Sequence, residues 1–527
     1  MPHPNPSTPL LATASADKTV NVWSLRDFSL ISTISGGHKR SVRTVAWKDF
    51  GRSKRKKKQR DPVVLGTGSF DANVGIWVWN DDRRWTRLRN QDEQQGRKQD
   101  AAAQEATLAD EDEIDMTREA NDEEDEEWHF STLLTGPDSE IKSIEFSPPH
   151  YSANLLATSS RDKSVWIWEE VEPEEWETIA VLGEHTGDVK CVSWCAGARR
   201  GGRRGTKRRR LENEDDVGDA DVEMENVQSN GTSASLNLEA DEGSDDVVGS
   251  RNILASGSYD DTIRLWRDAD EEGDWICVGV IEGHTGTVWD LKWEGHINYS
   301  VLNLALCTSN SAFTDFEADW APRIVSCSDD LTVRVWRREL SDAEKEKRKQ
   351  TRTSSAVPTG FASARLPSII RPQSAMERWV EDATLPAVHV RSVYAVDWSK
   401  RSGLVVSCGG DGTIAVYREV VDMQPSTSTA SDADVVMNGM VAASNPATTS
   451  NTDSESTYTL HRTKWTLVAI MEGAHDEYEI NHVCWAARRD PGRRFEGEEV
   501  IVSTADDGDV KIWTLPYGVG DDPYVGR

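Results

Sequence analysis

The sequence is poor in the features that mark disulfide-bonded, metal-binding and membrane proteins. Its 527 residues include seven cysteines, an odd number, and no two of them form a C-x-x-C pair, which disfavours a disulfide framework and a cysteine metal site. No stretch approaches the roughly 20 apolar residues of a membrane-spanning helix, and the first residues lack a basic region followed by an apolar core. We expect no metal, no membrane association, and a cytoplasmic and nuclear location.

Seven short segments share apolar alternation, a turn with an aspartate, and an aromatic residue six positions after that aspartate. The pairs are Asp17/Trp23, Asp71/Trp77, Asp162/Trp168, Asp260/Trp266, Asp330/Trp336, Asp411/Tyr417 and Asp507/Trp513. A pattern that recurs at intervals indicates repeated structural units rather than one continuous core. It is typical of WD repeats, and seven copies predict an all-β, seven-bladed β-propeller.

A second pattern combines an apolar residue, another three positions later and an aromatic residue two beyond. It occurs six times, as Val42/Val45/Trp47, Ile141/Ile144/Phe146, Val189/Val192/Trp194, Val288/Leu291/Trp293, Val393/Val396/Trp398 and Ile480/Val483/Trp485. A histidine precedes five of them: His38, His185, His284, His389 and His475. In WD repeats this histidine joins the turn aspartate, a hydroxyl and the strand tryptophan in one hydrogen-bonded network. Pro137 replaces the histidine in the remaining blade, which should lack the full network.

Because these residues recur in blade after blade, we interpret them as scaffold and not as catalytic triads. Outside them the sequence shows no nucleophile–base pair, no cluster of metal ligands and no phosphate-binding loop. We therefore expect a protein that is not an enzyme and has no cofactor.

The propeller accounts for only part of the length, because seven blades of about 40 to 45 residues need roughly 300. We predict one propeller over residues 10–515, with blade centres near 10–25, 63–79, 155–169, 253–267, 324–337, 405–418 and 500–514. Disordered insertions are predicted at 81–127, 196–250, 338–377 and 420–463. Two acidic windows, 110–127 and 211–250, supply 24 of the 31 net negative charges, and such runs of like charge stay solvated.

The insertions are predicted to lie on one face. If the strands of a blade are labelled a to d, their antiparallel order places the a–b and c–d connections on one face and the b–c and d–a connections on the other. Every long insertion falls in an a–b or c–d connection. The b–c/d–a face keeps short turns, and we predict that it is the recognition surface.

Two basic runs, at residues 52–60 and 203–211, are compatible with nuclear import signals, weak nucleic-acid contacts or solvated loops. The net charge of −31 argues against a surface that follows a phosphate backbone, so direct nucleic-acid binding is not expected. The basic runs and acidic loops also leave open a chromatin- or histone-binding propeller.

The blade sequences resemble one WD-repeat family, the cytosolic iron-sulfur protein assembly family, in its filamentous-fungal form. The resembling segments spread over all seven blades: GGHKRSVRTVAW, GTGSFDANVGIW, LLATSSRDKSVWIWEE, LASGSYDDTIRLWR, EGHTGTVWDLKW, SCSDDLTVRVWRR, VYAVDW and GAHDEYEINHVCW. The resemblance implies a propeller that acts as a non-catalytic scaffold of the cytosolic iron-sulfur targeting complex. Its implied partners are a small subunit, a helical-repeat subunit, an iron-only-hydrogenase-like carrier and client iron-sulfur apoproteins.

The resemblance also singles out a surface arginine of the third blade, which is Arg161 within the motif SRDKSVW at residues 160–166. Arg161 falls in a b–c turn, on the face predicted above without the family. There it could bind a carboxylate, including a client's chain terminus, through two parallel hydrogen bonds, or it could pair with a neighbouring turn. Lys163, Arg43, Tyr259 and Tyr394 are further candidates, because tyrosine and arginine are favoured at interface centres.

The first and last blades are expected to be incomplete. A closed ring of seven four-stranded blades needs 28 strands, and the patterns account for 26. The first blade lacks its a strand and the last lacks its d strand, which family members supply from residues ahead of the first repeat. We expect that the sequence is a truncated gene model or isoform, that its ring does not close, and that its ladder edges are exposed.

Overall fold

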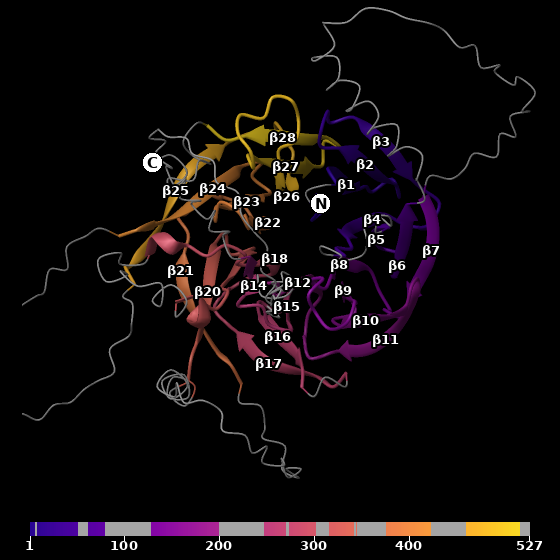
Figure 1. Cartoon of the computed structure of the whole chain (residues 1–527), viewed down its shortest axis with the longest axis horizontal. Helices are drawn as coiled ribbons and strands as arrows, with labels where there is room; N and C mark the ends of the chain where they lie inside the picture. Colours follow the sequence, from indigo (N-terminus) through magenta and orange to yellow (C-terminus); the bar gives the residue numbers. More distant parts are fainter. Residues whose placement is uncertain are drawn as a thin grey trace, which may run out of the picture.

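The computed structural model describes residues 1–5, 8–50, 62–79, 128–199, 247–269, 273–301, 316–341, 344, 376–422 and 460–516. Within them, seven antiparallel sheets stand as blades around a common axis (Figure 1). The predicted all-β class and the seven-bladed propeller are therefore confirmed.

Five blades have four strands each. They are β4 (Val42–Trp47), β5 (Val63–Ser69), β6 (Asn73–Trp79) and β7 (Trp128–Thr135) in blade 2; β8 (Ile141–Phe146), β9 (Leu155–Ser160), β10 (Val165–Glu172) and β11 (Glu175–Leu182) in blade 3; β12 (Val189–Trp194), β15 (Ile253–Ser258), β16 (Ile263–Asp268) and β17 (Trp275–Ile281) in blade 4; β18 (Val288–Trp293), β19 (Ile324–Ser328), β20 (Val333–Glu339) and β21 (Arg378–Thr384) in blade 5; and β22 (Val393–Trp398), β23 (Val405–Gly409), β24 (Ile414–Val421) and β25 (Thr463–Met471) in blade 6. Blade 1 has β1 (Leu10–Ala14), β2 (Val20–Ser24) and β3 (Leu30–Ile34), and blade 7 has β26 (Ile480–Ala487), β27 (Glu499–Ala505) and β28 (Val510–Thr514).

The second strands of the blades are the most deeply buried. Every residue of β9, β15, β19 and β23 is buried, and their sequences LLATSS, ILASGS, IVSCS and VVSCG combine aliphatic residues with small ones. The small residues let neighbouring blades approach closely: a Cβ added to Gly257 would lie 2.7 Å from Val288 Cγ1 of the next blade. Burial of the aliphatic residues, at about 1.5–3 kcal/mol each, provides most of the stabilisation between blades.

The incomplete first and last blades are confirmed, since each of their sheets has three strands. The expectation of an open ring is wrong. Residues of β1 and of β26 and β27, among them Leu11, Cys484 and Val502, form one apolar cluster between blades 1 and 7. In addition, Pro2 pairs with Leu11, so the first residues lie beside β1 where the other blades have their innermost strand.

A hydrogen bond of Trp47 also shows that the first residues take the place of the missing innermost strand of blade 1. Its Nε1 donates to the Met1 carbonyl at 2.8 Å. In blades 4 and 5 the equivalent donors, Trp194 and Trp293, bond to carbonyls of the preceding blade's innermost strand, those of Glu145 and Ser193. This contact was not predicted because strands were identified by alternating apolar residues. A single bridging residue such as Pro2 leaves no such pattern in the sequence.

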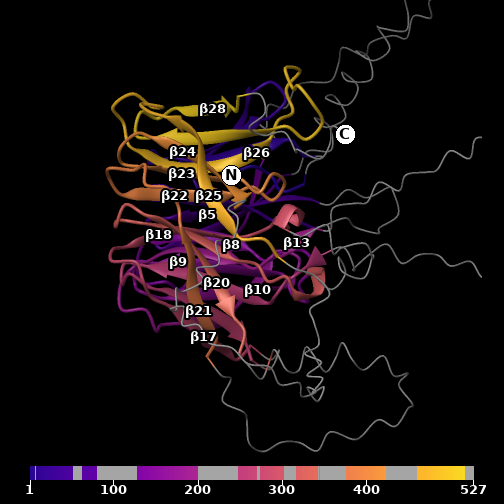
Figure 2. The same ribbon diagram turned by 90° about the vertical axis from the view of Figure 1, so that its left-hand side faces the viewer.

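The bounds predicted for the insertions are too wide. Most of the residues at 81–127, 196–250, 338–377 and 420–463 lie outside the described part of the chain, but the ends of three insertions are ordered. β13 (Ala198–Arg199) pairs with β14 (Val247–Val248), and β20 and β24 extend to Glu339 and Val421. Figure 2 shows β13 on one side of the ring. There, Ala198 and Val248 pack with Ile297 and Phe316 of blade 5 in a small apolar cluster.

Five blades contain the complete hydrogen-bonded network expected of WD repeats. In blade 4, His185 Nδ1 lies 2.9 Å from Asp260 Oδ2, His185 Nε2 lies 2.8 Å from Ser256 Oγ, and Trp266 Nε1 donates to the same oxygen at 2.8 Å. Equivalent networks form around His38, His284, His389 and His475. In blade 3 the backbone N–H of Asp138 donates to Asp162 at 2.8 Å, as the residue after the histidine does in blades 2, 4, 5 and 6. No side chain of the described d–a connection takes the place of the histidine, so the effect predicted for Pro137 is confirmed.

These Asp–His–Ser sets have the connectivity of a hydrolytic triad, but they cannot act as one. Ser256 is fully buried, and its oxygen accepts a hydrogen bond from Trp266 while its proton faces His185. A nucleophile must be reachable by its substrate. The network instead joins a d–a connection to a b–c turn on the same face.

The network carboxylates should make stability depend on pH. Burial raises the pKa of Asp260, but hydrogen bonds from His185 and Thr262 outweigh it and leave the pKa well below its ordinary value; Asp330 behaves alike with His284 and Thr332. Their contribution is present above the unfolded-state pKa of about 3.8 and is lost as the pH falls towards the folded-state value. We predict that D260N/D330N has a lower unfolding free energy at neutral pH and loses less of it between about pH 5 and pH 3.

This prediction is checked by urea unfolding across that pH range. The control is E175Q/E177Q, which removes two exposed carboxylates of β11 and should follow the wild-type curve. Parallel curves for D260N/D330N and the wild type would contradict the role assigned to these aspartates.

Candidate functional site

The b–c/d–a face is described in full, since all seven b–c turns and all six d–a connections lie within the described residues. Its turns are built alike. The residue after each aspartate has a positive φ, between 65° and 80°, at Lys18, Ala72, Lys163, Asp261, Leu331, Gly412 and Gly508. The backbone of the seven turns is thus nearly constant, and their side chains distinguish one blade from another.

Six innermost strands carry a β-bulge at the same place, one residue after they begin. Strand pairing shifts register at this point in β4, β8, β12, β18, β22 and β26. A bulged residue leaves the ladder and its side chain is redirected. Because these strands are nearest the axis (Figure 1), the bulged residues surround it on the b–c/d–a face. We call them the axial rim: Arg43, Lys142, Lys190, Trp289, Tyr394 and Asn481.

The rim is basic over blades 2 to 4, where one carboxylate serves three cations. Glu140 Oε2 accepts from Lys142 Nζ at 2.7 Å, while Glu140 Oε1 lies 3.4 Å from Arg40 and 3.5 Å from Arg161. Hydrogen bonding from Lys142 outweighs the opposing effect of burial and lowers the pKa of Glu140. Glu140 is therefore ionised at neutral pH, yet it is committed mainly to Lys142.

A second shared carboxylate is Asp188, which lies 3.2 Å from Lys190 and 4.0 Å from Arg161. The Lys190 ammonium also faces two aromatic rings, 4.9 Å from the Trp289 centroid and 5.7 Å from that of Tyr259. Such cation–π contacts restrict the position of the lysine. Its charge is therefore held on the rim.

The rim is aromatic over blades 5 and 6. Trp289 and Tyr394 meet edge to face with centroids 5.3 Å apart. Trp289 Nε1 donates to Asp329 at 2.6 Å and the Tyr394 hydroxyl donates to Glu479 at 3.0 Å. Burial and the Glu479 charge raise the pKa of Tyr394 to about 12, so this hydroxyl stays a donor at neutral pH. A continuous series of contacts thus runs from blade 4 to blade 7.

Arg161 is held loosely. Its side chain is 57% exposed, and its contacts with Glu140 and Asp188, at 3.5 and 4.0 Å, are longer than a strong charge-assisted hydrogen bond. Both carboxylates have shorter contacts with lysines. Arg161 therefore pairs with neighbouring turns, but only weakly, and its binding of a partner's carboxylate stays a prediction.

The structure brings together four of the five predicted binding residues. Arg43 and Tyr394 belong to the axial rim, and Arg161 and Tyr259 occupy the adjacent b–c turns. Lys163 is exposed at the left-handed position of its turn, and its side chain makes no ion pair with the described residues. Sequence analysis missed Lys142, Lys190 and Trp289, although they follow the first apolar residue of their strands just as Arg43 and Tyr394 do.

The opposite face has a groove of about 900 Å³ between blades 3 and 4, lined by residues that include Tyr151, Glu169, Ser250, Arg251 and Arg267. His150 Nε2 lies 2.5 Å from Ser250 Oγ there. The structure gives His150 no orienting carboxylate among the described residues, and Ser250 is 3.4 Å from the Cys195 carbonyl. The pair therefore lacks the third group of a hydrolytic triad.

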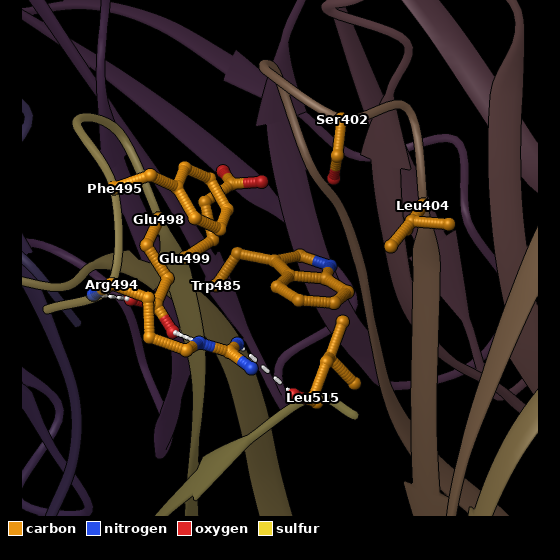
Figure 3. A pocket seen from close by; sticks show the side chains of 8 residues that line it. All are labelled: Ser402, Leu404, Trp485, Arg494, Phe495, Glu498, Glu499 and Leu515. Atoms are coloured by element: carbon orange, nitrogen blue, oxygen red, sulfur yellow. Dashed lines mark hydrogen bonds and ion pairs between the residues drawn. The ribbon is translucent and has the colours of Figure 1, made fainter. Parts of the chain in front are cut away.

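A second cavity lies between blades 6 and 7, where Trp485 faces Ser402, Leu404 and Leu515 (Figure 3). It measures about 10 Å³, room for about one water molecule, which is too small for an organic substrate. In the described segments, no three histidine, cysteine or acidic residues are grouped as metal ligands. The same segments contain no helix with the length and apolarity to cross a bilayer.

The aromatic contact on the rim should be measurable. We predict that W289A and Y394A are coupled by about 0.5–1.5 kcal/mol in unfolding free energy, the range for edge-to-face pairs. A double-mutant cycle measured by urea unfolding tests this. The control cycle combines W289A with Y478A, an exposed residue of blade 7, and should show coupling below about 0.5 kcal/mol. Equal coupling in both cycles would rule out a specific contact.

Comparison with known proteins agrees with this architecture. The model of the WD domain, G-beta repeat, matches residues 3–24, 128–169, 244–267, 275–337 and 383–418. Relatives named "Probable cytosolic iron-sulfur protein assembly protein 1" include that of Aspergillus flavus, 42% identical over 97% of this chain and 93% of the relative. Those of Penicillium rubens and Neurospora crassa are 41% and 35% identical, over 97% of this chain and 94% and 91% of their own lengths. The chain therefore belongs to the WD-repeat family of cytosolic iron-sulfur protein assembly protein 1.

Proposed function

We propose that this protein is a non-catalytic scaffold of cytosolic iron-sulfur protein assembly. It binds other proteins through its b–c/d–a face and helps transfer clusters to cytosolic and nuclear apoproteins. Membership of the family, whose relatives are named for cytosolic iron-sulfur protein assembly, supports the pathway. The same names support a cytoplasmic location, and the proposal includes a nuclear one, with which the basic runs at residues 52–60 and 203–211 are compatible.

The observation that carries the surface assignment is the incomplete pairing of Arg161. An exposed arginine with two long ion pairs can bind a partner's carboxylate without first losing a strong internal bond. The b–c turn of the next blade carries Tyr259, which is 63% exposed. Arginine and aromatic side chains are the residue types that dominate binding energy at interfaces.

The partners we propose are a small subunit and a helical-repeat subunit of the targeting complex, the iron-only-hydrogenase-like carrier and the client apoproteins. The cluster is cargo in this role, since the scaffold positions proteins rather than ligating metal. The arrangement does not favour the alternative of a histone-binding propeller, because histone tails are basic and the surface around Arg161 carries an excess of cations.

The test of this proposal is R161E. We expect the Kd for partners or clients to rise at least tenfold, because the introduced glutamate repels the partner's carboxylate that Arg161 would bind. The circular dichroism spectrum should stay that of the wild type. The control is R378E, which reverses an arginine that is 78% exposed on the outer strand β21 and should bind as the wild type does. Wild-type capture of partners and clients by R161E would remove Arg161 from the binding site.

A further inference from the structure

Three rim residues on adjacent blades are cations. Arg43, Lys142 and Lys190 occupy the equivalent bulge of β4, β8 and β12, so the propeller geometry directs them to the same sector of the axis. They influence one another electrostatically: burial is the main cause that lowers the pKa of Lys142, and the charges of Lys190 and Arg43 lower it further. The fold therefore places like charges near one another.

The carboxylates nearby do not neutralise this sector. Four cations, Arg40, Lys142, Arg161 and Lys190, share Glu140 and Asp188 as their ion-pair partners within 4 Å, and Arg43 adds a fifth positive charge to the sector. Five positive charges against two leave an excess of three on a chain whose net charge is −31. Arg43 has no ion pair with the described residues. Asp290, farther along the axis, and Asp506 of blade 7 act on it only as more distant charges.

The cations are also held in place before anything binds. Lys142 lies 4.4 Å from the Phe70 ring of blade 2 and is hydrogen-bonded to Glu140, and Lys190 lies between Tyr259 and Trp289. Restricting a long side chain in advance removes part of the entropy that binding would otherwise cost. Each lysine keeps ammonium protons beyond its single carboxylate, because a lysine has three donors.

We propose that Arg43, Lys142 and Lys190 together bind an acidic side chain within an internal segment of a partner protein. This contact is separate from the one made by Arg161, and it rests on the proposed function in that the partner is another protein. Alone or clustered, aspartate or glutamate side chains supply the missing negative charge. The site is local, with aromatic residues on one flank, whereas a nucleic acid needs a basic track along its backbone.

The acidic segment passes over the axis, with its carboxylate towards the basic sector of the rim and its neighbouring residues over Trp289 and Tyr394. The protein's overall negative charge repels acidic partners at long range, so the local excess of three decides which acidic segments can dock. This combination provides specificity, since an acidic segment that does not reach the rim is repelled.

The experiment uses the full-length protein and two fluorescent hexapeptides, one of glutamate and one of glutamine, both acetylated and amidated so that neither has a terminal carboxylate. Fluorescence polarisation at low salt gives Kd. We expect the glutamate peptide to bind at least tenfold more tightly than the glutamine peptide, and K142M/K190M to lose about tenfold of that affinity. Methionine keeps the stem of lysine without its charge. R43M should weaken binding in the same direction.

The matched control is K464M, which removes an exposed lysine paired with Asp422 on the outer strand β25 and should leave Kd unchanged. The charge reversal K142E/K190E should make the protein bind a capped hexalysine peptide more tightly than the glutamate peptide. That result would show that the rim of the variant is folded and able to bind. The proposal would be overturned if the glutamate and glutamine peptides bound equally well. It would also be overturned if K142M/K190M bound the glutamate peptide with the Kd of the wild type.

Capture of partners from the targeting complex separates this proposal from the proposed function. Loss of capture in R161E together with wild-type capture in K142M/K190M would overturn the rim contact and leave the scaffold role intact. Loss of capture in both variants, with K464M unaffected, supports both. Wild-type capture in R161E with loss in K142M/K190M would support the rim and remove Arg161.

Discussion

The buried hydrogen-bonded network found in five blades is the interaction on which most of the binding face depends. In blade 4, His185 connects the d–a connection to the b–c turn through Asp260, and to the core of the blade through Ser256 and Trp266. Because unsatisfied polar groups are costly when buried, the complete network rigidly determines how the two connections sit relative to each other. Tyr259 is presented by a turn of this kind, whereas Arg161 belongs to the turn of blade 3. In blade 3, which lacks the histidine, hydrogen bonds from backbone N–H groups still join the two connections: Asp138 donates to Asp162 and Arg161 donates to the Glu140 carbonyl.

The second constraint is the bulge that begins each of six innermost strands. It takes one residue per blade out of the ladder and directs it to the axis, so six positions far apart in sequence become one rim. The identity of these residues divides the rim into a basic sector over blades 2 to 4 and an aromatic one over blades 5 and 6. Contacts between blades, such as Lys190 with Trp289, join the two sectors. Recognition on this face is thus a property of several blades together.

Electrostatics distinguishes the rim from the rest of the chain. Most of the negative charge lies in two acidic windows within the insertions, and the insertions belong to connections on the other face. Among the described residues, Glu140 and Asp188 are the carboxylates that form ion pairs with the basic sector. Since exposed charges are screened over about 8–10 Å at physiological salt, the local excess of cations on the rim, and not the net charge, governs what binds there.

Much of the fold was predictable because the hydrogen-bonding residues of WD repeats recur at fixed spacing in the sequence. The aspartates, histidines and tryptophans, the effect of Pro137 and the three-stranded end blades all followed from counting. Arg43 and Tyr394 were predicted for their chemistry, but Lys142 and Trp289 were not, because side-chain type was weighed without the register that makes these positions equivalent. The ordered ends of the insertions, such as the pairing of Ala198 with Val248, were missed because short ribbons have no periodic pattern.

By itself, then, the sequence determined the number of blades, the scaffold residues and the face that carries the short turns, because each of these depends on contacts local to one repeat. Only the tertiary structure decided that the ring closes through an apolar cluster between blades 1 and 7, and that four cations share two carboxylates near one axis. Those features include contacts between residues far apart in the chain, such as Leu11 with Cys484 and Arg40 with Glu140, and only the packing of blade against blade brings such residues together.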